Sequence, residues 1–118
     1  MIGSTRAVRV FARNGPTDLR KGFDGLYALV VNELGQDPLA GDLYLFINSR
    51  RTSAKVLLWD GTGLCIYAKR ISRGRFAQLW VDVSQGKPLA LTHAELQLFM
   101  EGADIAGRLP ISPPEIVI

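Results

Sequence analysis

The segment KVLLWDGTGLCIYAKR, residues 55–70, contains two apolar runs separated by a short turn motif. Asp60 stands directly before the tripeptide GTG, and this chemistry is typical of a tight connection between two strands. We therefore predict that the two runs form an antiparallel hairpin. In the second run both faces carry apolar residues, so the sheet is expected to be covered on both sides or to meet a partner.

Three further segments extend this sheet in the prediction. GDLYLFIN, residues 41–48, is another apolar run that precedes the hairpin. RAVRVFAR, residues 6–13, alternates with the period of a strand, with Val8, Val10 and Ala12 on one side. GRFAQLWVDV, residues 74–83, is expected to continue the sheet. The pattern predicts an α+β single domain with an antiparallel sheet of about four to five strands and two main helices.

The first helix is predicted at residues 18–34, because TDLRKGFDGLYALVVNELG has helical spacing of its apolar residues. Thr17 or Asp18 is expected to cap its start, and Gly35 to end it. Gly22 and Gly25 each cost about 1 kcal/mol relative to alanine inside a helix. We interpret them as positions where another element packs closely against the backbone.

The second helix is predicted at residues 93–101. In LTHAELQLFMEG, residues 91–102, Thr92 is followed three residues later by Glu95, which is the pattern of a capping box. Gly102 is expected to end the helix. The apolar stripe of this helix is interpreted as part of the core rather than as a ligand site.

The length of 118 residues suits one domain, predicted at residues 1–108. Residues 109–118 contain three prolines and are expected to form an extended tail. The first ten residues have no apolar stretch of the kind that a secretory signal needs. Cys65 is the single cysteine, so an internal disulfide is impossible, and a cytoplasmic location is expected.

Positive charge is concentrated between residues 50 and 75, although the whole chain carries a net charge of only +3. This segment has one carboxylate, Asp60, and seven basic residues: Arg50, Arg51, Lys55, Lys69, Arg70, Arg73 and Arg75. Two interpretations are open, an anion-binding surface or the solvated edge of a sheet. The predicted hairpin brings both ends of the segment together. We therefore predict that its basic residues, Lys55 excepted, form one continuous positive surface.

The sequence contains few residues of the types that usually act in catalysis or bind metal ions. His93 is the single histidine, and one cysteine with one histidine cannot form a structural zinc site. The glycines near Asp60 lack the lysine of a phosphate-binding loop. No acidic residues form a close pair of the kind that a two-metal nuclease needs. Neither a catalytic residue nor a cofactor nor a metal is predicted; Asp60 is interpreted as a turn residue and Cys65 as a packing residue.

Three blocks of the sequence resemble a known family: TDLRKGFDGL, RRTSAKVLLWDGTGLCIYAKRISRGRF and LTHAELQLFMEG. In their order and spacing they are similar to the TnpB-type accessory proteins of bacterial insertion sequences of the IS sixty-six family, over about residues 6–104. This is not the RNA-guided nuclease that shares the TnpB name. The chain departs from the family pattern where Thr52 and Ser53 replace a common Asp-Arg pair, and where AQLW stands in place of a Trp-Pro.

The resemblance implies a protein encoded beside a separate DDE-type transposase, which it assists. No catalytic centre is implied. The expected function is that of a non-enzymatic accessory protein that binds transposon DNA through the basic segment, joined by Arg20 and Lys21. The alternative is an adaptor that binds the transposase through the same cations without contacting DNA, because an acidic protein surface attracts them equally.

Overall fold

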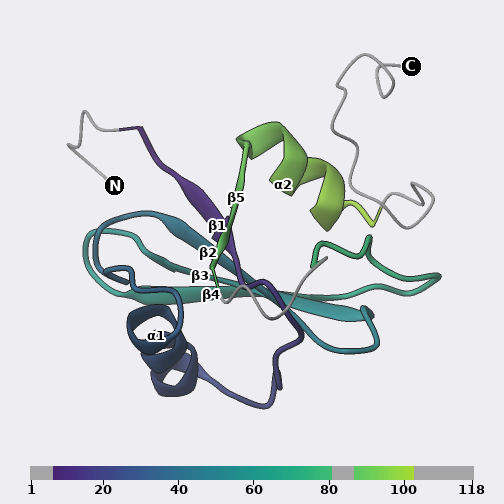
Figure 1. Ribbon diagram of the computed structural model, residues 1–118, viewed down its shortest axis with the longest axis horizontal. Coiled ribbons are helices and arrows are strands. Elements are labelled where there is room, and N and C mark those ends of the chain that lie inside the picture. Colours follow the sequence, from purple (N-terminus) through teal and green to yellow (C-terminus); the bar gives the residue numbers. More distant parts are fainter. Residues whose placement is uncertain (1–6, 81–86, 103–118) are drawn as a thin grey trace.

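The computed structural model describes residues 7–80 and 87–102, and it confirms the α+β class. A five-stranded sheet lies between two helices on its opposite faces (Figure 1). The elements in chain order are β1 Val10–Ala12, α1 Phe23–Asn32, β2 Leu43–Ile47, β3 Ser53–Trp59, β4 Leu64–Arg70, β5 Leu89–Leu91 and α2 His93–Met100. The order across the sheet is β4-β3-β2-β1-β5, so β4 and β5 form its edges.

The predicted hairpin is confirmed. β3 and β4 pair antiparallel from Ser53 opposite Arg70 to Trp59 opposite Leu64. β2 pairs antiparallel with β3, and β5 pairs antiparallel with β1, so the sheet is mostly antiparallel. The pair β1–β2 is parallel, which differs from the antiparallel arrangement expected for the sheet. The reason is that α1 lies between these two strands and returns the chain to the end where β1 began.

The start of α1 was predicted five residues too early. The helix begins at Phe23, and Gly22 occupies the position of its N-cap. Thr17 and Asp18 are therefore not caps; the backbone N–H of Thr17 donates to the carbonyl of Ile47, beside the end of β2. Residues 17–21 are thus held against the sheet in a non-helical path.

The close packing of another element, expected at the two glycines, is found at neither Gly22 nor Gly25. A Cβ at Gly22 would have no atom within 4 Å, whereas one at Gly25 would lie 2.9 Å from the Cβ of Lys21. The neighbour at Gly25 is a residue of the preceding turn and not a separate element. Gly25 thus permits the chain to fold back closely at the first turn of α1.

The predicted capping box of α2 is confirmed. The hydroxyl of Thr92 accepts from the backbone N–H of Glu95, and the carboxylate of Glu95 accepts from the backbone N–H of Thr92. Gly102 follows the helix with φ of +69°, the left-handed conformation that suits a glycine after a helix end. Its position is also tight, because a Cβ there would lie 2.3 Å from Cδ1 of Ile71.

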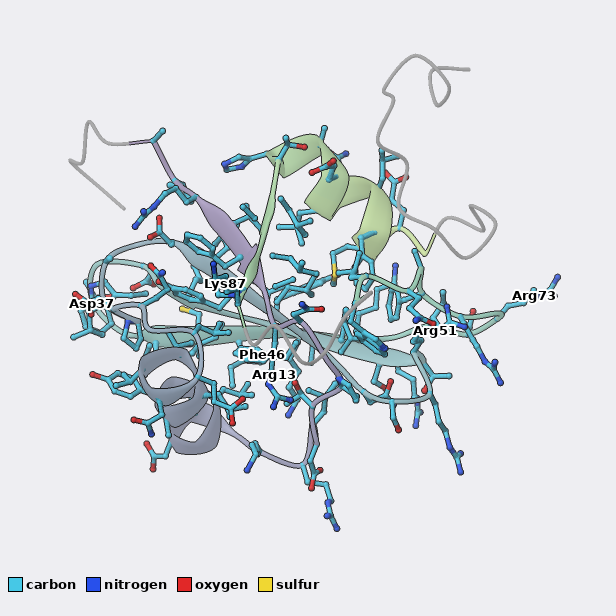
Figure 2. All side chains as sticks on the ribbon, in the orientation of Figure 1. Arg13, Asp37, Phe46, Arg51, Arg73 and Lys87 are labelled. Carbon is cyan, nitrogen blue, oxygen red and sulfur yellow. The ribbon has the colours of Figure 1, made fainter. Side chains whose placement is uncertain are left out.

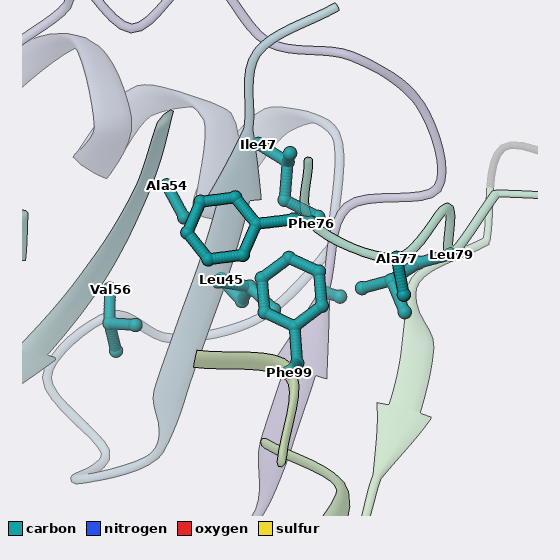
Figure 3. Packing of buried hydrophobic residues seen from close by; sticks show 9 residues of the cluster. Leu45, Ile47, Ala54, Val56, Phe76, Ala77, Leu79 and Phe99 are labelled. Atoms are coloured by element: carbon teal, nitrogen blue, oxygen red, sulfur yellow. The ribbon is translucent and has the colours of Figure 1, made fainter. Parts of the chain in front are cut away.

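Each face of the sheet has its own apolar cluster, as the apolar content of both faces had indicated. The α1 side buries Leu26, Val30, Leu34, Tyr44, Phe46 and Leu57. The α2 side buries Ala12, Leu45, Ile47, Ala54, Val56, Phe76, Ala77, Leu79 and Phe99 (Figure 3). The alternation of β2 explains this division, because its successive side chains enter opposite clusters.

Residues 74–80 do not continue the sheet, so this part of the prediction is wrong. Phe76 is fully buried, and its ring stacks on that of Phe99 with 4.8 Å between the ring centroids (Figure 3). The apolar residues of this segment cover the α2 face of the sheet instead of pairing with a strand. Residues 81–83, which belonged to the same predicted strand, and the predicted tail at 109–118 lie outside the described residues.

Candidate nucleic-acid interface

Two basic loops are joined at one end of the sheet. The first is the turn between β2 and β3, and the second is the segment that follows β4. The backbone N–H of Ile71 donates to the carbonyl of Thr52 over 2.9 Å, and that of Phe76 donates to the carbonyl of Arg51 over 2.7 Å. Burial of Phe76 anchors the second loop to the core. The basic residues of both loops are therefore presented by one rigid unit.

Asn48 organises the first loop, and the sequence analysis did not identify it. Its side-chain carbonyl accepts from the backbone N–H groups of Thr52 and Ser53. Its amide nitrogen donates to the hydroxyl of Thr52 over 3.1 Å. Thr52 and Ser53 are the residues that depart from the family pattern, and here they serve the turn. An asparagine directly after an apolar strand is the signal that could have indicated this role.

Arg51 has a structural role in the same loop. Its φ of +59° is the left-handed conformation, which is uncommon for a residue other than glycine. Its guanidinium donates to the carbonyl of Phe76 over 2.9 Å, beside the backbone bond between these two residues. Arg51 thus fastens the two loops to each other, and part of its donor capacity is used inside the protein.

Lys55 and Lys69 also bind backbone carbonyls. The ammonium of Lys55 donates to the carbonyls of Leu19 and Lys21 over 2.7 and 3.0 Å, and so holds the segment before α1. The ammonium of Lys69 donates to the carbonyl of Met100 over 2.7 Å, at the end of α2. A cation at this end of a helix is favoured by the helix dipole. Both lysines stabilise the fold in the first instance.

The predicted continuous surface must be corrected for Lys69. Lys69 pairs with Ala54, which is buried on the α2 side. Arg70 is the next residue of the same strand, and successive side chains of a strand point to opposite faces. The two residues therefore lie on different faces of the sheet, and Lys69 is excluded from a surface that contains Arg70.

What remains is a smaller group of arginines, which we call the basic end. Its members are exposed and have no bonding partner for their side chains among the described residues: Arg50, Arg70, Arg73 and Arg75. They come from the two joined loops and from the last residue of β4. Figure 2 shows Arg73 projecting from this end of the molecule, beyond Arg51. The basic end is the part of the basic segment that is available to an external anion.

Arg20 and Lys21 lie before α1, and Arg20 lines a shallow depression that extends to Arg70. One part of the depression is lined by Arg20, Asn48 and Ser49, and the adjoining part by Lys55 and Arg70; both parts include Leu19 and Ser53. The guanidinium of Arg20 is paired with the carboxylate of Asp18 over 2.7 Å. Hydrogen bonds from Arg20 hold the pKa of Asp18 well below its usual range. The charge of Arg20 is thus balanced locally.

Asp60, Cys65 and His93 each have a partner within the fold. Asp60 accepts hydrogen bonds from the backbone of Thr62 and Gly63 and from the hydroxyl of Thr62, and these bonds lower its pKa to about 2. This confirms its role as a turn residue. Burial and a hydrogen bond to Asp60 raise the pKa of the Cys65 thiol. The exposed His93 has Nε2 2.6 Å from the carbonyl oxygen of Val8.

Within residues 7–80 and 87–102, no group of three acidic, histidine or cysteine side chains is arranged to hold a metal ion. In the same part of the chain neither helix has the length and apolar character that crossing a membrane requires.

Comparison with known proteins shows relatives over nearly the whole chain. The model of the family described as IS66 Orf2 like protein matches residues 8–109. The uncharacterized protein y4hO of Sinorhizobium fredii is 36% identical over 104 residues, which cover 88% of each chain. The uncharacterized protein y4jC of the same strain is 34% identical over 116 residues, which cover 97% of each chain. No solved structure matches significantly. The chain therefore belongs to the family of IS66 Orf2 like proteins, which are associated with the transposition of insertion sequences of this type.

Proposed function

We propose that this protein assists transposition by binding the DNA of its insertion sequence through the basic end, without catalysing a reaction itself. The observation that carries the proposal is the position of Arg50, Arg70, Arg73 and Arg75, which are exposed on two loops that hydrogen bonds hold together. Arginines suit phosphate oxygens, because the planar guanidinium can donate to two oxygens at once.

Four carboxylates of the described residues have structural partners, which supports a binding role rather than a catalytic one. Asp18 is paired with Arg20, Asp42 with Arg9, and Glu33 with Arg13. Asp60 is fully engaged in its turn. Each of these groups has a defined structural partner, so none is poised to hold a catalytic ion or to activate water.

The proposal is tested by titrating the purified protein against duplex DNA from the end of the element at two salt concentrations, with the transposase absent. Each phosphate contact lowers log affinity by about 0.9 for each tenfold rise in salt, so four arginines predict a slope of roughly −3 to −4. Absence of binding at both concentrations would refute DNA as the direct partner. Binding to purified transposase in its place would support the adaptor, which uses the same cations on an acidic protein surface.

A further inference from the structure

Among the described strands, β4 lies at one edge of the sheet. It pairs with β3 and occupies the end of the strand order. Two hydrogen bonds at the two ends of the hairpin fix the orientation of its backbone. The N–H of Asp60 donates to the carbonyl of Gly63 over 3.1 Å, and the N–H of Ile71 donates to the carbonyl of Thr52 over 2.9 Å.

These two bonds show which residues of β4 direct their backbone N–H and C=O groups away from β3. In an antiparallel pair, hydrogen-bonded and non-bonded residue pairs alternate. Gly63 and Ile71 are both in bonded pairs, so Cys65, Tyr67 and Lys69 also direct their N–H and C=O groups toward β3. The residues between them direct the same groups away from the sheet: Leu64, Ile66, Ala68 and Arg70.

The outward backbone groups have no partner within residues 7–80 and 87–102. A row of unpaired N–H and C=O groups on a regular strand is a template for another strand. In the centre of the same strand Tyr67 exposes 57% of its surface, the largest value among the large apolar and aromatic residues that the structure describes. The edge thus combines a free hydrogen-bonding pattern with an exposed aromatic ring.

We propose that β4 pairs antiparallel with β4 of a second copy of this chain, with Tyr67 opposite the partner's Tyr67. This register places Ile66 opposite Ala68 and Leu64 opposite Arg70. All outward-facing backbone groups of β4 then meet outward-facing groups of the partner, and the two sheets form one continuous sheet.

The cations of β4 and the position of α1 favour a second copy of this chain as the partner of the β4 edge. In the antiparallel register Lys69 lies opposite Cys65, so no cation of β4 lies opposite another. A parallel arrangement in matching register would instead bring the basic ends of both strands together, which is unfavourable. Because α1 packs on β3 and β4, the dimer also brings both α1 helices to the same face. This helix carries exposed Phe23 and Val31, apolar side chains that a second helix nearby could cover.

Sedimentation of the full chain tests the proposal first. The chain has a mass of 13.0 kDa, so the expected dimer has twice that mass. Tyr67→Lys should convert it to a monomer, because it places two ammonium groups opposite each other at the two-fold axis. Leu39→Lys is the control, an exposed apolar position between α1 and β2 that takes no part in the proposed contact, and it should leave the dimer intact.

Disulfide trapping tests the register independently of stability. Directly opposed residues of a non-bonded pair have Cα atoms about 4.5 Å apart, which is within the range of a disulfide. In a Cys65→Ser background, Tyr67→Cys should therefore form a covalent dimer under mild oxidation. Ser72→Cys in the same background should not, because the two copies of residue 72 lie at opposite ends of the strand pair.

Two results would overturn the proposal. One is a monomer by sedimentation at tens of micromolar together with no trapping through Tyr67→Cys. The other is a dimer that persists in both Tyr67→Lys and Ala68→Pro. The proline removes an outward N–H and leaves the β3–β4 bonds intact, so a dimer insensitive to both changes must use another surface. Neither measurement involves DNA, so these results are independent of the function proposed above.

Discussion

The ammonium of Lys69 donates a hydrogen bond to the carbonyl of Met100 over 2.7 Å, and so joins β4 to the last turn of α2. Met100 is the last residue of that helix, and carbonyls in the last turn of a helix lack partners within the helix. Lys69 therefore stabilises the contact between β4 and α2. Although it belongs to the basic segment, it does not contribute to the exposed positive surface.

Lys69→Met should destabilise the protein by about 1 to 3 kcal/mol, because it removes a hydrogen bond to a charged donor and leaves the carbonyl unpaired. Chemical unfolding measures the change. Lys87→Met is the matched control, since Lys87 is exposed and makes no bond within the described residues, and it should change stability by less than about 0.5 kcal/mol. Equal effects at the two positions would contradict a structural role for Lys69.

Arg51 is predicted to be strained by its left-handed backbone. Arg51→Gly and Arg51→Ala both remove the bond to the carbonyl of Phe76, but only glycine adopts a φ of +59° without cost. The glycine variant should therefore be more stable than the alanine variant by about 1 kcal/mol. The same pair of changes at Arg50, which has no positive φ, should favour alanine. Thermal unfolding of the four variants provides the comparison.

Asp60 is predicted to make stability depend on pH in the acid range. Its pKa is lowered to about 2 in the folded protein from an ordinary value of 3.8. A depressed pKa contributes stability that is complete above the unfolded value and is lost as pH falls through the folded value. Asp60→Asn retains an acceptor for the turn but does not titrate. The difference in unfolding free energy between the two proteins should thus decline between about pH 4 and pH 2, and a constant difference across this window would contradict the assignment.

Local patterns predicted much of this fold, and distant contacts account for the errors. The hairpin follows from Asp60 and its glycines, and the start of α2 follows from Thr92 and Glu95, because each signal lies within a few residues of the element it defines. The start of α1 was misplaced because the carbonyls of the preceding segment are bound by Lys55, which lies 36 positions from Leu19 and 34 from Lys21. A helical pattern contains no information about such a contact.

The same limit applies to the candidate site. The sequence identified every member of the basic end, because clustering of charge is visible in the chain. It could not separate those arginines from Lys55 and Lys69, whose carbonyl partners come from other elements. Phe76 was assigned to a strand because its apolar neighbours resemble one, whereas its stacking on Phe99 depends on the position of α2.

The last prediction tests the basic end directly. Charge reversal at Arg70 and Arg73 together should weaken DNA binding equally for all sequences, because phosphate contacts position a protein without reading bases. It should also reduce the magnitude of the salt slope by about 2, since two contacts of about 0.9 each are removed. Anisotropy titrations at several salt concentrations measure both effects.

A matched charge change elsewhere makes the result specific. Lys87→Glu reverses a cation just before β5, which is the opposite edge of the sheet from β4. It should lower affinity slightly through the net charge and leave the salt slope unchanged, because no phosphate contact is lost. If Lys87→Glu flattened the slope as much as the double reversal, DNA would not be bound through the basic end. Both proteins should unfold at the same denaturant concentration, since none of these side chains has a partner within the described residues.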